Sequence, residues 1–141
     1  MKLVDTDFLI DLQREWASES PGPAVAFLQL HQGTGLAVST VSVLEFLEGY
    51  EHPSAGERLL EAYSRLPVTD SVARRGSRLR RRLRTEGRMI GDFDVLIAAT
   101  ALDAGLPLVT ANTTHFQRVE GLTVEPYRAA ASPQSEPRMS D

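Results

Sequence analysis

Three acidic residues from distant parts of the sequence could do chemistry together: Asp5, Glu45 and Asp94. Asp5 ends the segment KLVD, which is typical of a short buried strand, and Glu45 lies in a predicted helix after a second such strand. Asp94 lies in the first turn of an apolar helix that leads into a later strand. Because functional groups gather beyond the carboxyl ends of strands in an open α/β sheet, we expect the three carboxylates to converge at one edge.

A cluster of this kind predicts a bound metal ion. Like charges at close range do not all stay ionised unless a cation offsets them. Oxygen ligands favour a hard cation, Mg²⁺ or Mn²⁺, over zinc. Such an ion polarises a phosphodiester and activates water, so metal-assisted hydrolysis is the expected reaction class. Thr6, next to Asp5, and Thr110 with Asn112, just past the fourth predicted strand, are the expected supporting residues.

The first acidic residues also have a purely structural interpretation. Asp5, Thr6 and Asp7 could form the start of a helix, with Thr6 or Asp7 as the cap, because short oxygen-bearing side chains accept hydrogen bonds from free helix amides. Asp11 is expected on the exposed face of that helix. The three histidines show no metal-ligand spacing and are expected to be ordinary surface or loop residues: His31, His52 and His115.

The other two acidic residues differ in how easily structure alone explains them. Glu45 follows Ser42 by three positions, so the pair could be a capping box. Asp94 opens an apolar helix for which Asp92 already supplies the expected cap. A second acid there is surplus to the needs of the helix, which favours a functional role for Asp94.

An arginine-rich segment follows in the middle of the chain. Between residues 74 and 88 the only acidic residue is Glu86, although the whole protein has a net charge of −4. Leu79 and Leu83 give this segment a helical apolar stripe that faces the core. The charged face is either simply solvated or a contact for an RNA backbone or an acidic partner. The candidate RNA-binding residues are Arg78, Arg81, Arg82 and Arg88.

The composition indicates one globular domain. The chain has 141 residues, of which 42% are hydrophobic and 24% charged, and it contains no cysteine. Disulfides and thiolate metal sites are thereby excluded, and a reducing compartment is the simpler expectation. No apolar run is long enough to cross a membrane, and acidic residues interrupt any signal-peptide pattern. We therefore expect a cytoplasmic protein.

Short apolar strands alternate with helical segments along the chain, which predicts a parallel sheet covered on both faces. The expected strands are 2–5, 36–39, 67–69, 106–110 and 122–127. The expected helices are 6–15, 24–32, 40–50, 55–66, the segment beyond residue 70, and 91–105. Residues 1–128 are expected to form the domain and residues 129–141 a disordered tail.

The opening LVDTDFLIDL also resembles the first motif of haloacid-dehalogenase-type phosphatases, in which the first Asp of Asp-x-Asp accepts a phosphoryl group. Response-regulator receivers similarly gather acids at strand ends. Both chemistries use a downstream lysine, whereas Lys2 is the only lysine of this chain. Arginine is a poor replacement for the compact ammonium group, so an aspartate-based phosphohydrolase is disfavoured.

Three segments together resemble a PIN domain, of the type found as the toxin of VapBC toxin–antitoxin pairs. The segments are LVDTDFLIDL, STVSVLEFLEGY and IGDFDVLIAATALDAGLPLVTANTTHFQRVEGLTVE, in this order and over residues 2 to about 126. The resemblance assigns metal binding to Asp5, Glu45 and Asp94, and polar positions beside the metal to Thr110 and Asn112. It implies a three-layer α/β/α sandwich, Mg²⁺- or Mn²⁺-dependent endoribonuclease activity on tRNA, rRNA or mRNA, a homodimer, and inhibition by a VapB-like antitoxin.

The chain departs from this family at one point. Many relatives carry a fourth acid at the position of Asn112 or His115, and here neither residue is acidic. A second metal site would therefore be weak, with Asp92 as a candidate substitute. The alternative to a nuclease is a non-enzymatic module that binds RNA or a partner through the arginine-rich helix.

Overall fold

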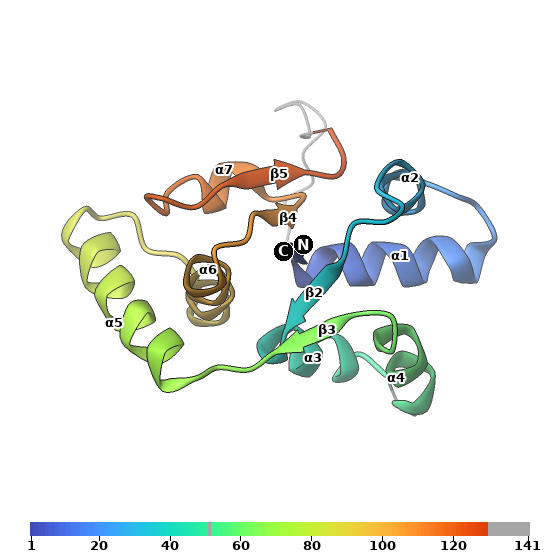
Figure 1. Ribbon diagram of the computed structural model, residues 1–141, viewed down its shortest axis with the longest axis horizontal. Coiled ribbons are helices and arrows are strands. Elements are labelled where there is room, and N and C mark those ends of the chain that lie inside the picture. Colours follow the sequence, from blue (N-terminus) through green and yellow to red (C-terminus); the bar gives the residue numbers. More distant parts are fainter. Residues whose placement is uncertain (51, 130–141) are drawn as a thin grey trace.

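Five short strands form one sheet in the middle of the molecule (Figure 1). The computed structural model describes residues 1–50 and 52–129, and its strands lie in the order β3-β2-β1-β4-β5. All four neighbouring pairs are parallel. The strands are β1 (Lys2–Val4), β2 (Leu36–Ser39), β3 (Ser64–Leu66), β4 (Leu108–Thr110) and β5 (Val124–Pro126). The predicted α/β fold with a central parallel sheet is confirmed.

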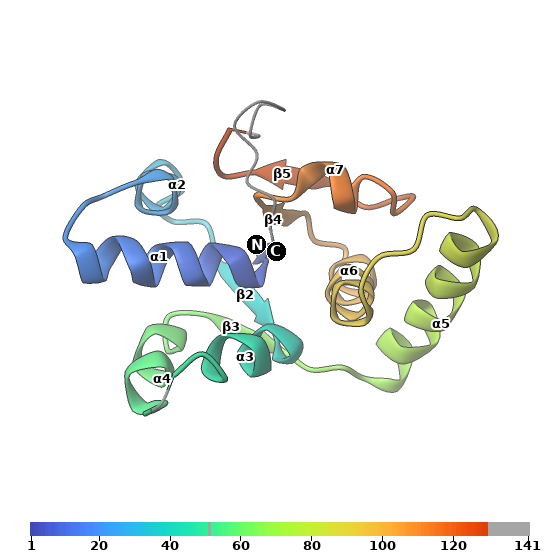
Figure 2. The ribbon, with the colours of Figure 1, turned by 180° about the vertical axis from the view of Figure 1, so that it is seen from behind.

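Helices cover both faces of this sheet. They are α1 (Thr6–Ser18), α2 (Pro23–Leu30), α3 (Thr40–Leu47), α4 (Ser54–Leu60), α5 (Asp70–Thr85), α6 (Asp92–Ala104) and α7 (Thr113–Phe116). Figures 1 and 2 show α1 and α2 on one side of the molecule, and α5 and α6 on the other. The arrangement is a three-layer α/β/α sandwich, as expected.

Alternate strand residues supply two separate cores, because successive side chains of a strand point to opposite faces of the sheet. Toward α5 and α6 the sheet contributes Leu3, Ala37 and Leu108. Toward α1 and α2 it contributes Val4, Val38 and Val109. The three central strands β1, β2 and β4 are buried on both faces, which explains why their sequences are apolar runs, whereas the edge strands β3 and β5 are more exposed and include charged residues.

The third strand lies earlier in the chain than predicted. Helix α4 ends at Leu60, and β3 occupies Ser64–Leu66, where Leu66 aligns with Ser39 of β2. The prediction of a helix over residues 55–66 and a strand over 67–69 is therefore wrong. Pro67 has no backbone N–H to contribute to a ladder, so the edge strand ends before it.

Two further expectations concern the ends of the chain and the membrane. The predicted disordered tail lies, from residue 130 onward, outside the described residues. Within the part of the chain that the structure describes, no helix is both long and apolar enough to span a membrane.

Candidate active site

The carboxyl ends of β1 and β4 bring Asp5 and Thr110 together. Val4 aligns with Val109 in the sheet, so the residues that follow them, Asp5 and Thr110, are neighbours. The fully buried Thr110 hydroxyl donates to Asp5 Oδ2 over 2.8 Å. Asp5 Oδ1 accepts from the backbone N–H of Thr6 over 2.7 Å, which makes Asp5 the N-cap of α1. The cap is thus Asp5 and not, as predicted, Thr6 or Asp7.

Glu45 reaches this edge through a contact with Thr6. The Thr6 hydroxyl donates to Glu45 Oε1 over 2.6 Å and lies 2.9 Å from Ser42 Oγ. Helix α3 begins at Thr40 with Ser39 as its N-cap, so the alternative of a capping box between Ser42 and Glu45 is wrong. Glu45 therefore does not cap α3, and its carboxylate accepts a hydrogen bond from Thr6 of α1.

Asp94 lies in the first turn of α6, as predicted, but Asp92 does not cap that helix. The N-cap is Gly91, which offers no side chain, and Asp92 is exposed with Oδ1 3.3 Å from a terminal guanidinium nitrogen of Arg80. Asp94 Oδ2 lies 2.9 Å from His115 Nε2. His115 is thus a partner of a candidate catalytic carboxylate, and its prediction as an ordinary surface or loop residue is wrong.

The electrostatics show that these carboxylates share one environment. Burial, together with the negative charges of Asp7 and Asp94, raises the pKa of Asp5 to about 8, although hydrogen bonds from Thr110 and Thr6 act to lower it. Burial also raises the pKa of Glu45, to which Asp94 again contributes. The negative charge of Asp94 therefore disfavours ionisation of both Asp5 and Glu45, and burial adds to this effect most strongly at Asp5.

The two remaining acids of α1 are more involved than the sequence predicted. Burial raises the pKa of Asp7 to about 6; its Oδ2 accepts from the backbone N–H of Ala111, and its buried Oδ1 has no hydrogen-bond partner. Asp11 accepts 2.6 Å hydrogen bonds from the Tyr127 hydroxyl and from Arg128. The exposed position expected for Asp11 is wrong, because Tyr127 and Arg128, just after β5, cover its side chain.

Asn112 contributes its backbone and leaves its side chain exposed. Its N–H donates to the Thr110 hydroxyl over 3.0 Å, and its side chain does not cap α7. The hydroxyl of Thr110 therefore joins the loop after β4 to the carboxylate of Asp5.

The donor set fits a hard divalent cation. Over residues 1–50 and 52–129, no lysine or arginine forms an ion pair with Asp5, Asp7, Glu45 or Asp94. In the same residues no three acidic or histidine side chains are already placed to hold a metal ion together. Asp5, Glu45 and Asp94 instead contact Thr110, Thr6 and His115, respectively. An unpaired buried oxygen and mutually repelling carboxylates are features that a cation would relieve.

The arginines of α5 divide into paired and unpaired side chains. Paired side chains include Arg74 with Asp70 at 2.7 Å, and Arg82 with Glu120 at 2.7 Å. Arg75 and Arg80 contact Asp103 and Asp92 more loosely, at 3.5 and 3.3 Å. Within the described residues, four side chains of the segment form no ion pair: Arg78, Arg81, Arg84 and Arg88.

Comparison with known proteins identifies the family. The family model described as PIN domain matches residues 2–122, and the chain belongs to this family. It is 38% identical over 119 residues to ribonuclease VapC19 of Mycobacterium tuberculosis, covering 82% of this chain and 92% of that protein. It is 37% identical over 103 residues to the tRNA(fMet)-specific endonuclease VapC of Shigella flexneri, covering 68% and 77%.

A solved structure gives the same result for the fold. The structure of VapBC-1 from nontypeable Haemophilus influenzae matches with a TM-score of 0.74 and 26% identity, over 89% of this chain and 97% of that one. The resemblance to PIN domains that the three sequence segments carry is confirmed. Nucleases of this family generally depend on a divalent metal ion.

Proposed function

We propose that this protein is the toxin of a type II toxin–antitoxin pair, a Mg²⁺- or Mn²⁺-dependent endoribonuclease that hydrolyses RNA phosphodiesters and thereby inhibits growth. The observation that carries the proposal is that Asp94 lies close enough to both Asp5 and Glu45 to raise their pKa values, at one edge of the parallel sheet of a PIN domain. The relatives named ribonuclease and endonuclease VapC support the choice of RNA as the substrate.

Asp5, Glu45 and Asp94 would hold the ion. When bound, the ion supplies charge that offsets the carboxylates and polarises the scissile phosphodiester. Thr110 and Thr6 orient Asp5 and Glu45 through hydrogen bonds of 2.8 and 2.6 Å, so two of the three carboxylates have a fixed direction. The exposed Asn112 side chain stands at the same strand end as Thr110 and can contact the substrate phosphate or the ion.

The acidic site also suggests how the protein is inhibited. A cluster of carboxylates without a lysine or arginine partner attracts a basic side chain, and a charge-assisted hydrogen bond there would block the substrate. We propose that a cognate VapB-like antitoxin provides this group and that the toxin is a homodimer. The solved VapBC-1 structure supports the assignment of a toxin–antitoxin partner. We also propose that the protein acts in the cytoplasm, where its RNA substrate is found.

Induced expression of wild type and Asp5→Asn, followed by sequencing of cellular RNA 5′ ends, tests the proposal. We expect growth arrest and a defined set of new RNA ends with the wild type and neither with the variant. Circular dichroism of the purified proteins controls for folding, since asparagine keeps the oxygen that caps α1. The same new ends with both proteins would overturn the assignment.

A further inference from the structure

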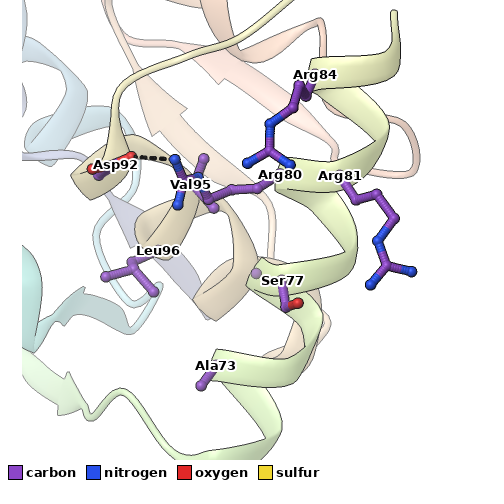
Figure 3. Close-up of a pocket in the computed structure, with 9 residues that line it drawn as sticks. Ala73, Ser77, Arg80, Arg81, Arg84, Asp92, Val95 and Leu96 are labelled. Carbon is purple, nitrogen blue, oxygen red and sulfur yellow. Dashed lines mark ion pairs between the residues drawn. The ribbon is translucent and has the colours of Figure 1, made fainter.

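A groove between α5 and α6 lies outside the acidic cluster (Figure 3). It has a volume of about 470 Å³. Gly76 of α5 and Val95 and Leu96 of α6 line it where the two helices pack against each other. Its rim is formed by Arg80, Arg81 and Arg84 of α5, together with Asp92 of α6.

The charges on this rim are not balanced. Figure 3 shows Arg80 and Arg84 directed toward α6, whereas Arg81 extends from the outer side of α5. Arg80 and Arg84 are four residues apart on one helix face, where two like charges repel each other. The only carboxylate among the residues that line the groove is Asp92, whose pair with Arg80 is loose at 3.3 Å and exposed, with 75% and 44% of the side chains accessible. Such a pair is weak and open to exchange.

The opposite side of α5 differs in this respect. There Arg75 and Arg82 contact Asp103 and Glu120 at 3.5 and 2.7 Å. That side also carries a cavity, lined by Arg75, Arg78 and Arg82, but there the 2.7 Å pair with Glu120 neutralises Arg82. Among the residues that line the groove, the one ion pair is the loose contact of Arg80 with Asp92, so the charges of the groove favour an anionic ligand.

The groove lies at the same end of α6 as the candidate active site. Asp92, which lines the groove, precedes Asp94 by two residues in the first turn of α6, whereas the cavity on the other side of α5 is lined by Leu102, near the end of that helix. An anionic chain held at Asp94 by one phosphodiester can therefore continue over the start of α6 and reach Arg80 and Arg84. Guanidinium groups bind phosphate oxygens through two parallel N–H donors, which suits this contact.

We infer that this groove binds the phosphate backbone of the RNA substrate beside the scissile bond, with Arg84 and Arg80 as its principal phosphate ligands. The inference rests on the proposed function, since it takes the ribonuclease site at Asp94 as its starting point. An RNA strand is favoured over an acidic peptide because the groove adjoins the site at which a phosphodiester must lie. The inference moves the principal RNA contact away from Arg82, which is engaged with Glu120.

The test measures binding of a fluorescent single-stranded RNA in EDTA, where cleavage is blocked, at a series of NaCl concentrations. We expect Arg84→Gln to weaken binding several-fold and to reduce the slope of log K against log salt by about 0.7, the value for one phosphate contact on a single strand. The double variant Arg80→Gln/Arg84→Gln should reduce it by about 1.4. Asp92→Asn, which removes the carboxylate of the groove, should tighten binding.

Arg74→Gln is the matched control, because it removes the same charge from an exposed position of the same helix, away from the groove. Equal affinity and slope for Arg84→Gln and Arg74→Gln would overturn the inference. So would unchanged RNA binding by Arg84→Gln together with loss of binding to a poly-glutamate peptide, a result that assigns the groove to an acidic protein.

Cleavage of the same RNA by the wild type in Mn²⁺ distinguishes a wrong groove assignment from a wrong proposed function. If the wild type cleaves and Arg84→Gln binds RNA as the parent does, the groove assignment alone is wrong. If the wild type neither cleaves nor binds RNA, the proposed function is wrong and the groove assignment falls with it.

Discussion

The acidic cluster and the arginine helix are the two strongly charged regions of this protein, and they differ most in their contact with water. Asp5 is only 6% exposed, and its nearest charged neighbours are further carboxylates. The arginines of α5 lie on an exposed surface; 72% of the Arg74 side chain is accessible, and its partner Asp70 is just as open. Burial therefore makes the charge of Asp5 costly, whereas water screens the charges of the second region.

This difference separates the roles of the two regions. A buried cluster of like charges costs stability and is retained where its chemistry needs it. An exposed run of arginines costs little, contributes little to the fold and stays available for an anionic ligand. We accordingly assign the reaction to the acidic cluster and substrate binding to the arginine helix.

The largest expected effect is loss of cleavage on neutralising a clustered acid. Asp94→Asn should lower the rate of RNA cleavage about 10³-fold, which corresponds to about 4 kcal/mol of activation free energy, because it removes one of the three charges that we propose as ligands of the ion. Asp103→Asn removes an acid from the other end of the same helix and should cleave at the parental rate. Initial rates on a labelled RNA measure both. Equal rates for the two variants would remove the distinction between the cluster and ordinary surface acids.

The second effect is a pH dependence of stability without metal. Because burial raises the pKa of Asp5 to about 8, from an ordinary value of 3.8, the folded state keeps a proton that the unfolded chain loses near pH 4. The contribution of protonated Asp5 to the free energy of unfolding is complete below pH 4 and is lost as the pH rises to about 8. In EDTA we expect the melting temperature to fall over this range by several degrees.

Calorimetry of Asp5→Asn provides the check on that prediction. The decline should become shallower in the variant, leaving the smaller part due to Asp7, whose pKa burial raises to about 6. Added Mn²⁺ should raise the melting temperature of the wild type more at pH 8 than at lower pH, because a larger fraction of the carboxylates is ionised there. A wild type and a variant with parallel pH curves would show that Asp5 is an ordinary solvated acid.

A smaller effect is expected from the hydroxyl that orients Glu45. Thr6→Val keeps the shape of the side chain but removes the donor to Glu45 Oε1, so cleavage should fall about tenfold. Thr6→Ser restores the hydroxyl and should recover most of the rate. If Thr6→Val requires more Mn²⁺ for half-maximal rate, the hydroxyl acts through the metal site; if Thr6→Val and Thr6→Ser are equally impaired, the methyl packing of Thr6 is what matters.

The smallest expected effect is the contribution of the α5 arginines to the free energy of unfolding. Arg74→Gln breaks an exposed pair with Asp70 and should change the free energy of unfolding by less than about 0.5 kcal/mol. Urea unfolding of the variant and the wild type measures the difference. A loss of 2 kcal/mol or more would mean that the arginines hold the fold together, against the division of roles described above.

Much of the site follows from the sequence because strand ends and helix starts are locally encoded. Apolar runs in the sequence indicate buried strands, so the neighbourhood of Asp5 and Thr110 could be predicted. The first-turn position of Asp94 followed from the expected cap at Asp92, which lies one residue beyond the observed N-cap Gly91. The metal-binding role of these residues stays a prediction. The edge strand β3 was misplaced because its sequence, Ser-Arg-Leu, carries no apolar run.

The missed contacts all depend on tertiary structure. His115 meets Asp94 across 21 residues, and Tyr127 and Arg128 meet Asp11 across more than 100. No periodicity encodes such pairs. The one available signal for His115 was its place in the segment where relatives carry a fourth acid.

The most direct test of the central claim is the cleavage rate of a labelled RNA after EDTA treatment, as Mn²⁺ is added back to wild type and Asp5→Asn in parallel. We predict no cleavage without metal, a saturable rise for the wild type, and a rate near background for the variant at every concentration. Cleavage that persists in EDTA, or an Asp5→Asn variant that matches the wild type, would contradict the assignment of the buried acids as a metal-dependent ribonuclease site.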